Sequence, residues 1–197
     1  MLPMDPYIVR ILALLGKRDP LEVLAKTTKD LQELFYSLNF RTQLTYEMGK
    51  WNALQIVCHL CDAEIGYGFR LRQVAYGQGI QPFDQDAWMG MHKGHTLGQA
   101  VQLFTNLRNW NLETWKSFTP EQLAITAEHP QRGPESVGLM LRFLAGHDLN
   151  HLAQLDKIAT LPRQVPQKNQ LFGPKPVETP TPAPAKAPSR ARKTSKK

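Results

Sequence analysis

Long stretches of helical periodicity, each introduced by a capping signal, constrain the fold of this chain more than any other feature. Asp19, Pro20 and Glu22 stand in the order of a capping residue, a first-turn proline and a third-position carboxylate, and apolar residues at helical spacing follow them. Similar signals recur along the chain. They predict four long helices, over residues 21–38, 52–76, 96–118 and 136–161.

Strand signals are missing from the same stretch of sequence. No segment alternates apolar and polar residues as a half-buried strand does, so we expect an all-α four-helix bundle without strands. The second and third long helices are joined by a long segment, Gly77 to His95, which predicts a crossover loop. Two short helices are expected as well, one from Tyr7 to Leu15 packing on the domain and one starting at Thr119.

Composition changes abruptly near Leu161. The segment from Pro162 onward holds 8 of the 15 prolines and nine basic against one acidic side chain, which accounts for more than the whole net charge of +7. Such a segment cannot bury enough apolar surface to offset its ordering entropy. We therefore predict a bundle domain over residues 1–161 and a disordered, basic tail over residues 162–197.

The charge and hydropathy of the chain exclude several classes of protein. No apolar run is long enough for a transmembrane helix, so no membrane partner is expected. The N-terminal apolar stretch follows Asp5 and Pro6 instead of basic residues, which argues against a signal peptide and predicts a cytoplasmic protein. The basic tail has no aromatic residues among its final charges, so we expect no specific nucleic-acid binding.

Three histidines are the candidates for chemistry. His147 and His151 stand four residues apart on the last predicted helix and continue its apolar stripe, so both imidazoles point inward and can reach a common metal ion. The spacing alone also fits two buried polar residues bonded to their neighbours. His59, in the middle of the second long helix, would be the natural third ligand, although a lone helical histidine is more often structural.

Three separated motifs resemble the DinB/YfiT-like metalloenzyme superfamily. They are GKWNALQIVCHLCDAE at 49–64, FDQDAW at 83–88 and AGHDLNHLAQL at 145–155. The family pattern has a G-K-W-[ST] start, an H-L-x-D-x-E helix and an H-D-x-x-H-L-x-Q helix, and the resemblance covers residues 15–161. Asn52 stands where the family has Ser or Thr, and it caps helices equally well.

The resemblance implies a four-helix bundle with zinc or nickel bound by three histidines, here His59, His147 and His151. Some members are thiol-S-transferases, which implies a small-molecule substrate and a low-molecular-weight thiol as partners. A metal-dependent hydrolase and a non-catalytic metal-binding or ligand-binding bundle stay open as alternatives. Relatives are often dimers, so the resemblance allows a homodimer, and the sequence leaves the oligomeric state open.

Further residues are candidates for supporting roles. Asp62, one turn after His59, is a candidate for orienting a ligand or lining the pocket, and Gln154, one turn after His151, for lining the pocket. Trp88 in the crossover loop either closes over the pocket or anchors the loop. Glu64 is interpreted as structural. Two kinds of role are equally open for Asp148. It can cap a helix or form a salt bridge with Arg142 or another neighbour, or it can belong to the site.

The two cysteines and the other three histidines are interpreted as residues without a catalytic, redox or metal-binding role. Cys58 and Cys61 form a CxxC in the middle of a predicted helix, where no helix N-terminus lowers a thiol pKa, so core packing is favoured over a redox pair. His92, His95 and His129 fall in predicted loops or turns. We expect them to be solvated and do not count them as metal ligands.

Overall fold

The computed structural model describes residues 5–163, and the predicted tail lies outside the described residues apart from its first two positions. This part of the chain contains α1 (Pro6–Leu15), α2 (Pro20–Leu38), α3 (Ala53–Ala75), α4 (Gln85–Met89), α5 (Leu97–Lys116), α6 (Pro120–Ala124), β1 (Thr126–His129), β2 (Gly133–Ser136) and α7 (Val137–Ala159). Within the described part, none of these helices is long and apolar enough to cross a membrane.

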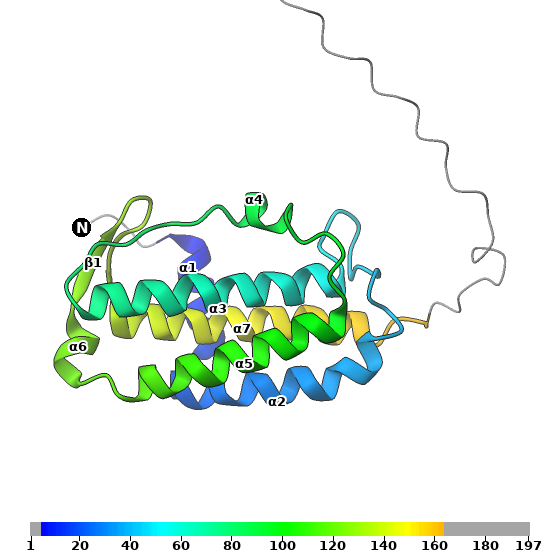
Figure 1. Cartoon of the computed structure of the whole chain (residues 1–197), viewed down its shortest axis with the longest axis horizontal. Coiled ribbons are helices and arrows are strands. Elements are labelled where there is room, and N and C mark those ends of the chain that lie inside the picture. The colour runs from blue at the N-terminus through cyan, green and yellow to red at the C-terminus, as the bar shows by residue number, and fades with distance from the viewer. Residues whose placement is uncertain (1–4, 164–197) are drawn as a thin grey trace, which may run out of the picture. The chain divides into compact units, whose positions relative to one another are not determined.

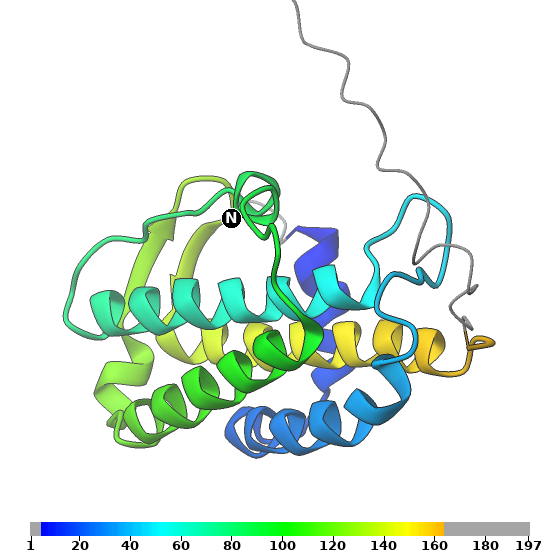
Figure 2. The ribbon, with the colours of Figure 1, turned by 45° about the vertical axis from the view of Figure 1, so that its right-hand side comes forward.

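The four long helices α2, α3, α5 and α7 form a bundle (Figure 1). Helix α2 packs against α5 and α7, and α3 packs against the same two helices from the opposite corner. The crossover segment between α3 and α5 runs the length of the bundle before α5 begins (Figure 2). Consequently α3 and α5 are parallel, and the predicted four-helix bundle with a long crossover loop is confirmed.

The predicted helix starts are confirmed in atomic detail. The Asp19 side chain accepts a hydrogen bond from the backbone N–H of Glu22. Asn52 with Gln55, and Thr96 with Gln99, form complete capping boxes in which each side chain bonds the backbone N–H of the other residue. These bonds satisfy backbone donors that a helix N-terminus otherwise leaves unpaired.

A polar layer divides the bundle core into two apolar clusters. One cluster includes Leu24, Trp115 and Leu144, and the other includes Leu31 and Phe104. All four long helices contribute buried polar side chains, and Arg108 of α5 bonds groups on the other three helices. The buried polar residues are Thr27, Thr28, His59, Asp62, Glu64, Arg108, His147, Asp148 and His151. A core interrupted in this way gives up apolar burial, which indicates that the layer has a specific role.

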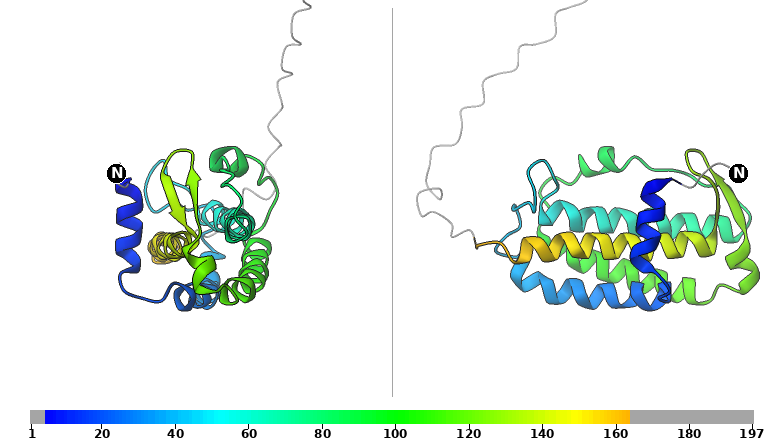
Figure 3. Two further views of the ribbon diagram at one scale, coloured as in Figure 1. Left: turned by 90° about the vertical axis from the view of Figure 1, so that its left-hand side faces the viewer. Right: turned by 180° about the vertical axis from the view of Figure 1, so that it is seen from behind.

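Helix α1 crosses α7 on the outside of the bundle, as Figure 3 shows, and confirms the predicted packing of the N-terminal helix. Ile8, Ile11 and Leu15 are its buried residues. The contact depends on Gly146, because a Cβ atom there would lie 2.2 Å from the carbonyl oxygen of Ile11. The glycine of the A-G-H-D motif therefore lets α1 approach α7 closely, one residue before His147.

A β-hairpin between α6 and α7 corrects the expectation of no strands. Strands β1 and β2 pair antiparallel, with Thr126 opposite Ser136 and His129 opposite Gly133. Each strand has four residues, too few for apolar alternation to stand out, and Pro134 lies within the second one. Gly133, the first residue of β2 after the turn, adopts a positive φ of 78°, which favours glycine.

The crossover loop is anchored to α3 through an aromatic pair. The rings of Phe83 and Trp88 lie 4.7 Å apart, and Phe83 packs over Gly66, where a Cβ atom would come within 2.5 Å of the Phe83 ring. Trp88 is half-buried on α4. The contact assigns Trp88 to anchoring the loop, one of the two roles that its position in the sequence allowed.

Candidate metal centre

The three histidines predicted as metal ligands meet within the polar layer. His59 comes from α3, while His147 and His151 lie one turn apart on α7. The Nε2 atom of His147 is 2.9 Å from Nε2 of His59 and 3.1 Å from Nε2 of His151. One ring nitrogen of each histidine lies within 4.8 Å of the other two. The structure therefore brings together the three side chains, and metal occupancy stays a prediction.

Burial keeps these imidazoles neutral. Burial, and to a smaller extent the neighbouring His151, lowers the pKa of His59 to about 3. Burial is also the main cause that lowers the pKa of His147 and of His151. Neutral imidazole has a free lone pair, so the cluster offers nitrogen ligands at neutral pH.

The tautomer of His151 is set by Gln154. The Nδ1 atom of His151 lies 2.8 Å from Oε1 of Gln154, an oxygen that only accepts, so Nδ1 carries the proton and Nε2 carries the lone pair. His59 and His147 also direct Nε2 inward, and their buried Nδ1 atoms have no hydrogen-bond partner. The three Nε2 atoms face one point, and each carries a lone pair when its Nδ1 is protonated, which suits the binding of a divalent ion.

Trp51 packs against the cluster and is a site residue that sequence reasoning missed. Its ring centroid lies 4.8 Å from that of His59 and 6.4 Å from that of His151. Trp51 belongs to the G-K-W motif just before α3, so the motif itself was the available signal. The indole covers the histidines on one side and restricts how their rings turn.

A buried ion-pair network next to the three histidines links α3, α5 and α7. The guanidinium of Arg108 on α5 bonds Oε1 of Glu64 at 2.6 Å and Oδ2 of Asp148 at 2.7 Å, and all three side chains are buried. Asn111 donates to Oε2 of Glu64 at 3.0 Å. Glu64 is therefore structural, as predicted, and the salt-bridge partner of Asp148 is Arg108 instead of Arg142. The network ties α5 to the residues beside His147.

Asp62 has a different role from the predicted one. Its Oδ2 lies 2.8 Å from Nε2 of His92, so the carboxylate holds the crossover loop and makes no hydrogen bond to His59, His147 or His151. Asp62 follows His59 by three residues, which turns its side chain toward the loop. His92 is correspondingly half-buried, and the expectation that it is solvated is wrong; His95 is exposed, as expected.

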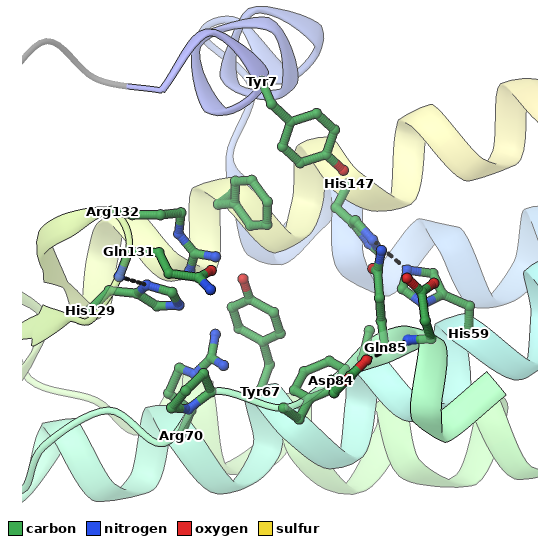
Figure 4. A pocket seen from close by; sticks show the side chains of 15 residues that line it. Tyr7, His59, Tyr67, Arg70, Asp84, Gln85, His129, Gln131, Arg132 and His147 are labelled. Atoms are coloured by element: carbon green, nitrogen blue, oxygen red, sulfur yellow. Dashed lines mark hydrogen bonds between the residues drawn. The ribbon is translucent and has the colours of Figure 1, made fainter. Parts of the chain in front are cut away.

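Two cavities meet at the histidines. The larger one has a volume of about 670 Å³ and the smaller one about 260 Å³. Tyr7, His59 and Gln85 line both, His147 lines the larger and His151 with Gln154 the smaller. Figure 4 shows Tyr7 above His147, and Gln85 beside His59. The cluster is therefore accessible from two hollows of unequal size.

Several cavity residues could not be found from the sequence. Tyr7 reaches the site only because α1 docks on α7, and Arg132 only because the unpredicted hairpin folds over the bundle. His129, expected as a solvated turn residue, is buried at the end of β1 and also lines the larger cavity. These residues lack helical periodicity or a motif, so their place depends on tertiary packing.

The cysteine pair is separate from this centre. Cys58 and Cys61 are buried free thiols in the second apolar cluster, and Cys61 donates to the carbonyl oxygen of Ala100 at 3.2 Å. Burial raises the pKa of Cys58 to about 11 and that of Cys61 to about 12. The prediction of core packing is confirmed.

Comparisons with known proteins agree with this architecture. The family model described as the DinB superfamily matches residues 23–155, a range that includes all three histidines. Two proteins of Oceanobacillus iheyensis, both named as candidate metal-dependent hydrolases, are similar to the chain. One is 23% identical over 123 residues, covering 61% of this chain and 72% of the relative. The other is 27% identical over 136 residues, covering 67% and 78%.

A solved structure shares the fold. YfiT from Bacillus subtilis, described as a probable metal-dependent hydrolase with an unusual four-helix bundle topology, superposes with a TM-score of 0.66. The sequences are 19% identical, and the match covers 71% of this chain and 83% of YfiT. The parallel arrangement of α3 and α5 described above is a topology that simple hairpin connections cannot produce.

Proposed function

Because the chain belongs to the DinB superfamily, we propose that it is a metal-dependent hydrolase acting on a small molecule. One observation carries the proposal: three neutral imidazole nitrogens converge in a wall shared by two cavities. The names of the two Oceanobacillus relatives support the same reaction class. The cavities are of a size that suits a small molecule rather than a polymer.

His59, His147 and His151 would hold the metal through Nε2. Three imidazoles suit zinc or nickel and leave a position for water or substrate. When bound, a divalent ion supplies a positive charge that polarises a carbonyl or activates water at neutral pH. Gln154 fixes the tautomer of His151, and Trp51 restricts the rings, so both residues orient ligands.

The remaining roles belong to the cavity walls. The phenol of Tyr7 is protonated at neutral pH, partial burial raises its pKa, and it can donate a hydrogen bond to a substrate oxygen. Phe143 and Ala63 give the larger cavity an apolar portion that contacts the body of the substrate. These residues would position the substrate and form hydrogen bonds with it, and a bound metal ion would supply positive charge.

A thiol-S-transferase is the second candidate, and the pair of cavities favours it. Transfer of a low-molecular-weight thiol to an electrophile needs two substrates at one centre, and the two hollows meet at His59. A hydrolase needs one organic substrate besides water. The names of the relatives favour the hydrolase and the paired cavities favour the transferase, so an activity assay has to separate the two reactions.

Turnover of matched substrates separates these candidates. The full-length protein, loaded with zinc or with nickel, is assayed with a panel of aryl esters, and separately with common cellular thiols plus a model electrophile. We expect metal-dependent ester hydrolysis that is lost in His147→Ala and retained in His95→Ala, an exposed histidine outside the cluster. Thiol consumption without hydrolysis would favour the transferase. Bound metal with neither activity would contradict both and leave the non-catalytic bundle.

A further inference from the structure

A buried arginine in the larger cavity lacks a counter-ion. Arg70, on α3, is 3% exposed, and its Nη2 donates to the carbonyl oxygen of Gln81 at 3.2 Å. Its Nε is buried without a hydrogen-bond partner. Across residues 5–163, Arg70 forms no salt bridge. Burying a guanidinium in this way is costly unless something compensates its charge.

Two further donors face the same part of the cavity. In Figure 4 the hydroxyl of Tyr67 and the guanidinium groups of Arg70 and Arg132 point into one region near the hairpin. Burial raises the pKa of Tyr67 to about 12, which keeps its hydroxyl a donor. Arg132 is already paired, since its Nε and Nη2 bond the carboxylate of Glu135 at 2.6 and 3.0 Å. One carboxylate therefore faces two guanidinium groups, so this cluster keeps one net positive charge.

The aromatic contacts keep the Arg70 guanidinium in place. Its central carbon lies 4.9 Å from the ring centroid of Tyr67 and 5.9 Å from that of Phe83. A guanidinium that contacts two rings presents its donors with little loss of side-chain entropy on binding. A fork of this kind matches the paired oxygens of a carboxylate or a phosphate.

We propose that the hairpin end of the larger cavity binds the anionic group, a carboxylate or a phosphate, of the substrate through Arg70, Tyr67 and Arg132. The identification of the ligand as the substrate rests on the proposed function, whereas anion binding itself does not. The anionic group then lies at one end of the cavity and the reacting bond faces His59 and His147, which line the same cavity.

The acidic residues of the larger cavity favour one orientation of an anionic substrate. Asp84 and Asp86 line this cavity, and Asp84 lies on the side of His59 in Figure 4, opposite His129 and Arg132. The carboxylate of Asp84 is engaged in capping α4, where it accepts from the backbone N–H groups of Asp86 and Ala87. An anionic group is repelled from this side and attracted to the hairpin side, so the substrate binds in one orientation.

Binding of simple anions tests the proposal without requiring turnover. The full-length protein as purified is titrated calorimetrically with phenylphosphonate and with benzoate, and benzamide serves as a neutral probe of similar shape. We expect phenylphosphonate, benzoate or both to bind, and benzamide to bind at least about tenfold more weakly, the scale of one charge-assisted contact. Equal binding of benzamide and both anions would overturn the proposal. The preferred anion tells which substrate class fits.

Substitutions of Arg70 test whether this side chain binds the anion. Arg70→Gln should weaken anion binding at least about tenfold, and Arg70→Lys, which keeps the charge but loses the fork, should lose less. Arg72→Gln is the matched control, because Arg72 lies on the same helix and bonds Asn111 and Thr114 outside the cavity. Circular dichroism confirms folding of each variant. Unchanged binding in folded Arg70→Gln would overturn the proposal.

A metal ion at the histidines could itself attract an anion, so the titration is repeated after chelator treatment. Anion binding that persists in the chelated protein, still folded by circular dichroism, supports the site at Arg70. Anion binding that disappears there would place the anion on the metal and overturn the proposal. If the anions bind and the ester panel is not turned over, the proposed function fails and the anion site stands.

Discussion

Burial makes the three histidines good metal ligands and poor bases. His59, His147 and His151 are each at most 6% exposed, and burial lowers the pKa of all three. Protonating them inside the bundle would place positive charges within a few ångströms of each other. A proton-transfer role at neutral pH is therefore less suitable for them than ligation.

The depressed pKa of His59 makes the stability of the metal-free protein depend on pH. In the unfolded chain His59 binds a proton near pH 6.5, and in the folded chain only near pH 3. Between these values the unfolded state binds more protons, so the free energy of unfolding falls as pH drops below 6.5. We expect a loss of about 1.4 kcal/mol per pH unit for each imidazole that stays neutral.

Urea unfolding of the chelated protein at pH 7, 6 and 5 measures this dependence. His59→Leu should show a shallower slope than the wild-type protein, and His95→Leu, which removes an exposed histidine, an unchanged one. A wild-type free energy of unfolding that stays constant from pH 7 to pH 5 would show that the imidazoles are not held neutral.

The two thiols should be unreactive while the protein is folded. Burial raises the pKa of Cys58 to about 11 and of Cys61 to about 12, so the thiolate that attacks a disulfide reagent is scarce at pH 8. Labelling with a chromogenic aromatic disulfide should be slow in the native protein, and both thiols should react after denaturation in urea. Fast labelling of the native protein would mean that the CxxC is accessible and redox-active.

At the scale of helices, the polar layer couples all four members of the bundle. Arg108 of α5 bonds Glu64 of α3, Asp148 of α7 and the carbonyl oxygen of Leu24 in α2. Removing the guanidinium leaves two buried carboxylates without their partner. Arg108→Met should therefore lower the free energy of unfolding by about 3–5 kcal/mol.

Chemical denaturation of Arg108→Met measures that loss, and Lys116→Met provides the control. Lys116 pairs with Glu113 on the exposed surface of the same helix, where an ion pair contributes about 1 kcal/mol or less. A loss in Arg108→Met no larger than that in Lys116→Met would contradict the structural role of the network.

The long helices could be predicted from the sequence because their capping boxes and apolar spacing are local. The signals at Asn52 and Thr96 coincide with observed capping residues. The hairpin could not be predicted, since strands of four residues carry little periodicity and are held by pairing with each other. For the site, the spacing of His147 and His151 made this pair a candidate for metal binding, whereas only the family resemblance linked His59 to it. Arg70 and Tyr67 carry no local signal for a cavity.

At the scale of the whole molecule, the chain's connectivity assembles the centre. The crossover segment places Gln85 over the histidines, α1 brings Tyr7, and the hairpin brings Arg132. Each of these parts lies outside the four long helices, and each contributes to the walls of the larger cavity. The bundle supplies the three candidate metal ligands, and the peripheral segments shape the cavity through which a molecule would reach them.

Metal content is the measurement that tests the central claim most directly. Elemental analysis of the purified full-length protein is compared with that of the alanine variants of His59, His147 and His151, with His95→Ala as control. We predict roughly one divalent ion per chain in the wild-type and control proteins, and loss of the ion from each cluster variant. Wild-type protein that binds no divalent ion even when zinc or nickel is supplied, or cluster variants that keep it fully, would contradict the account.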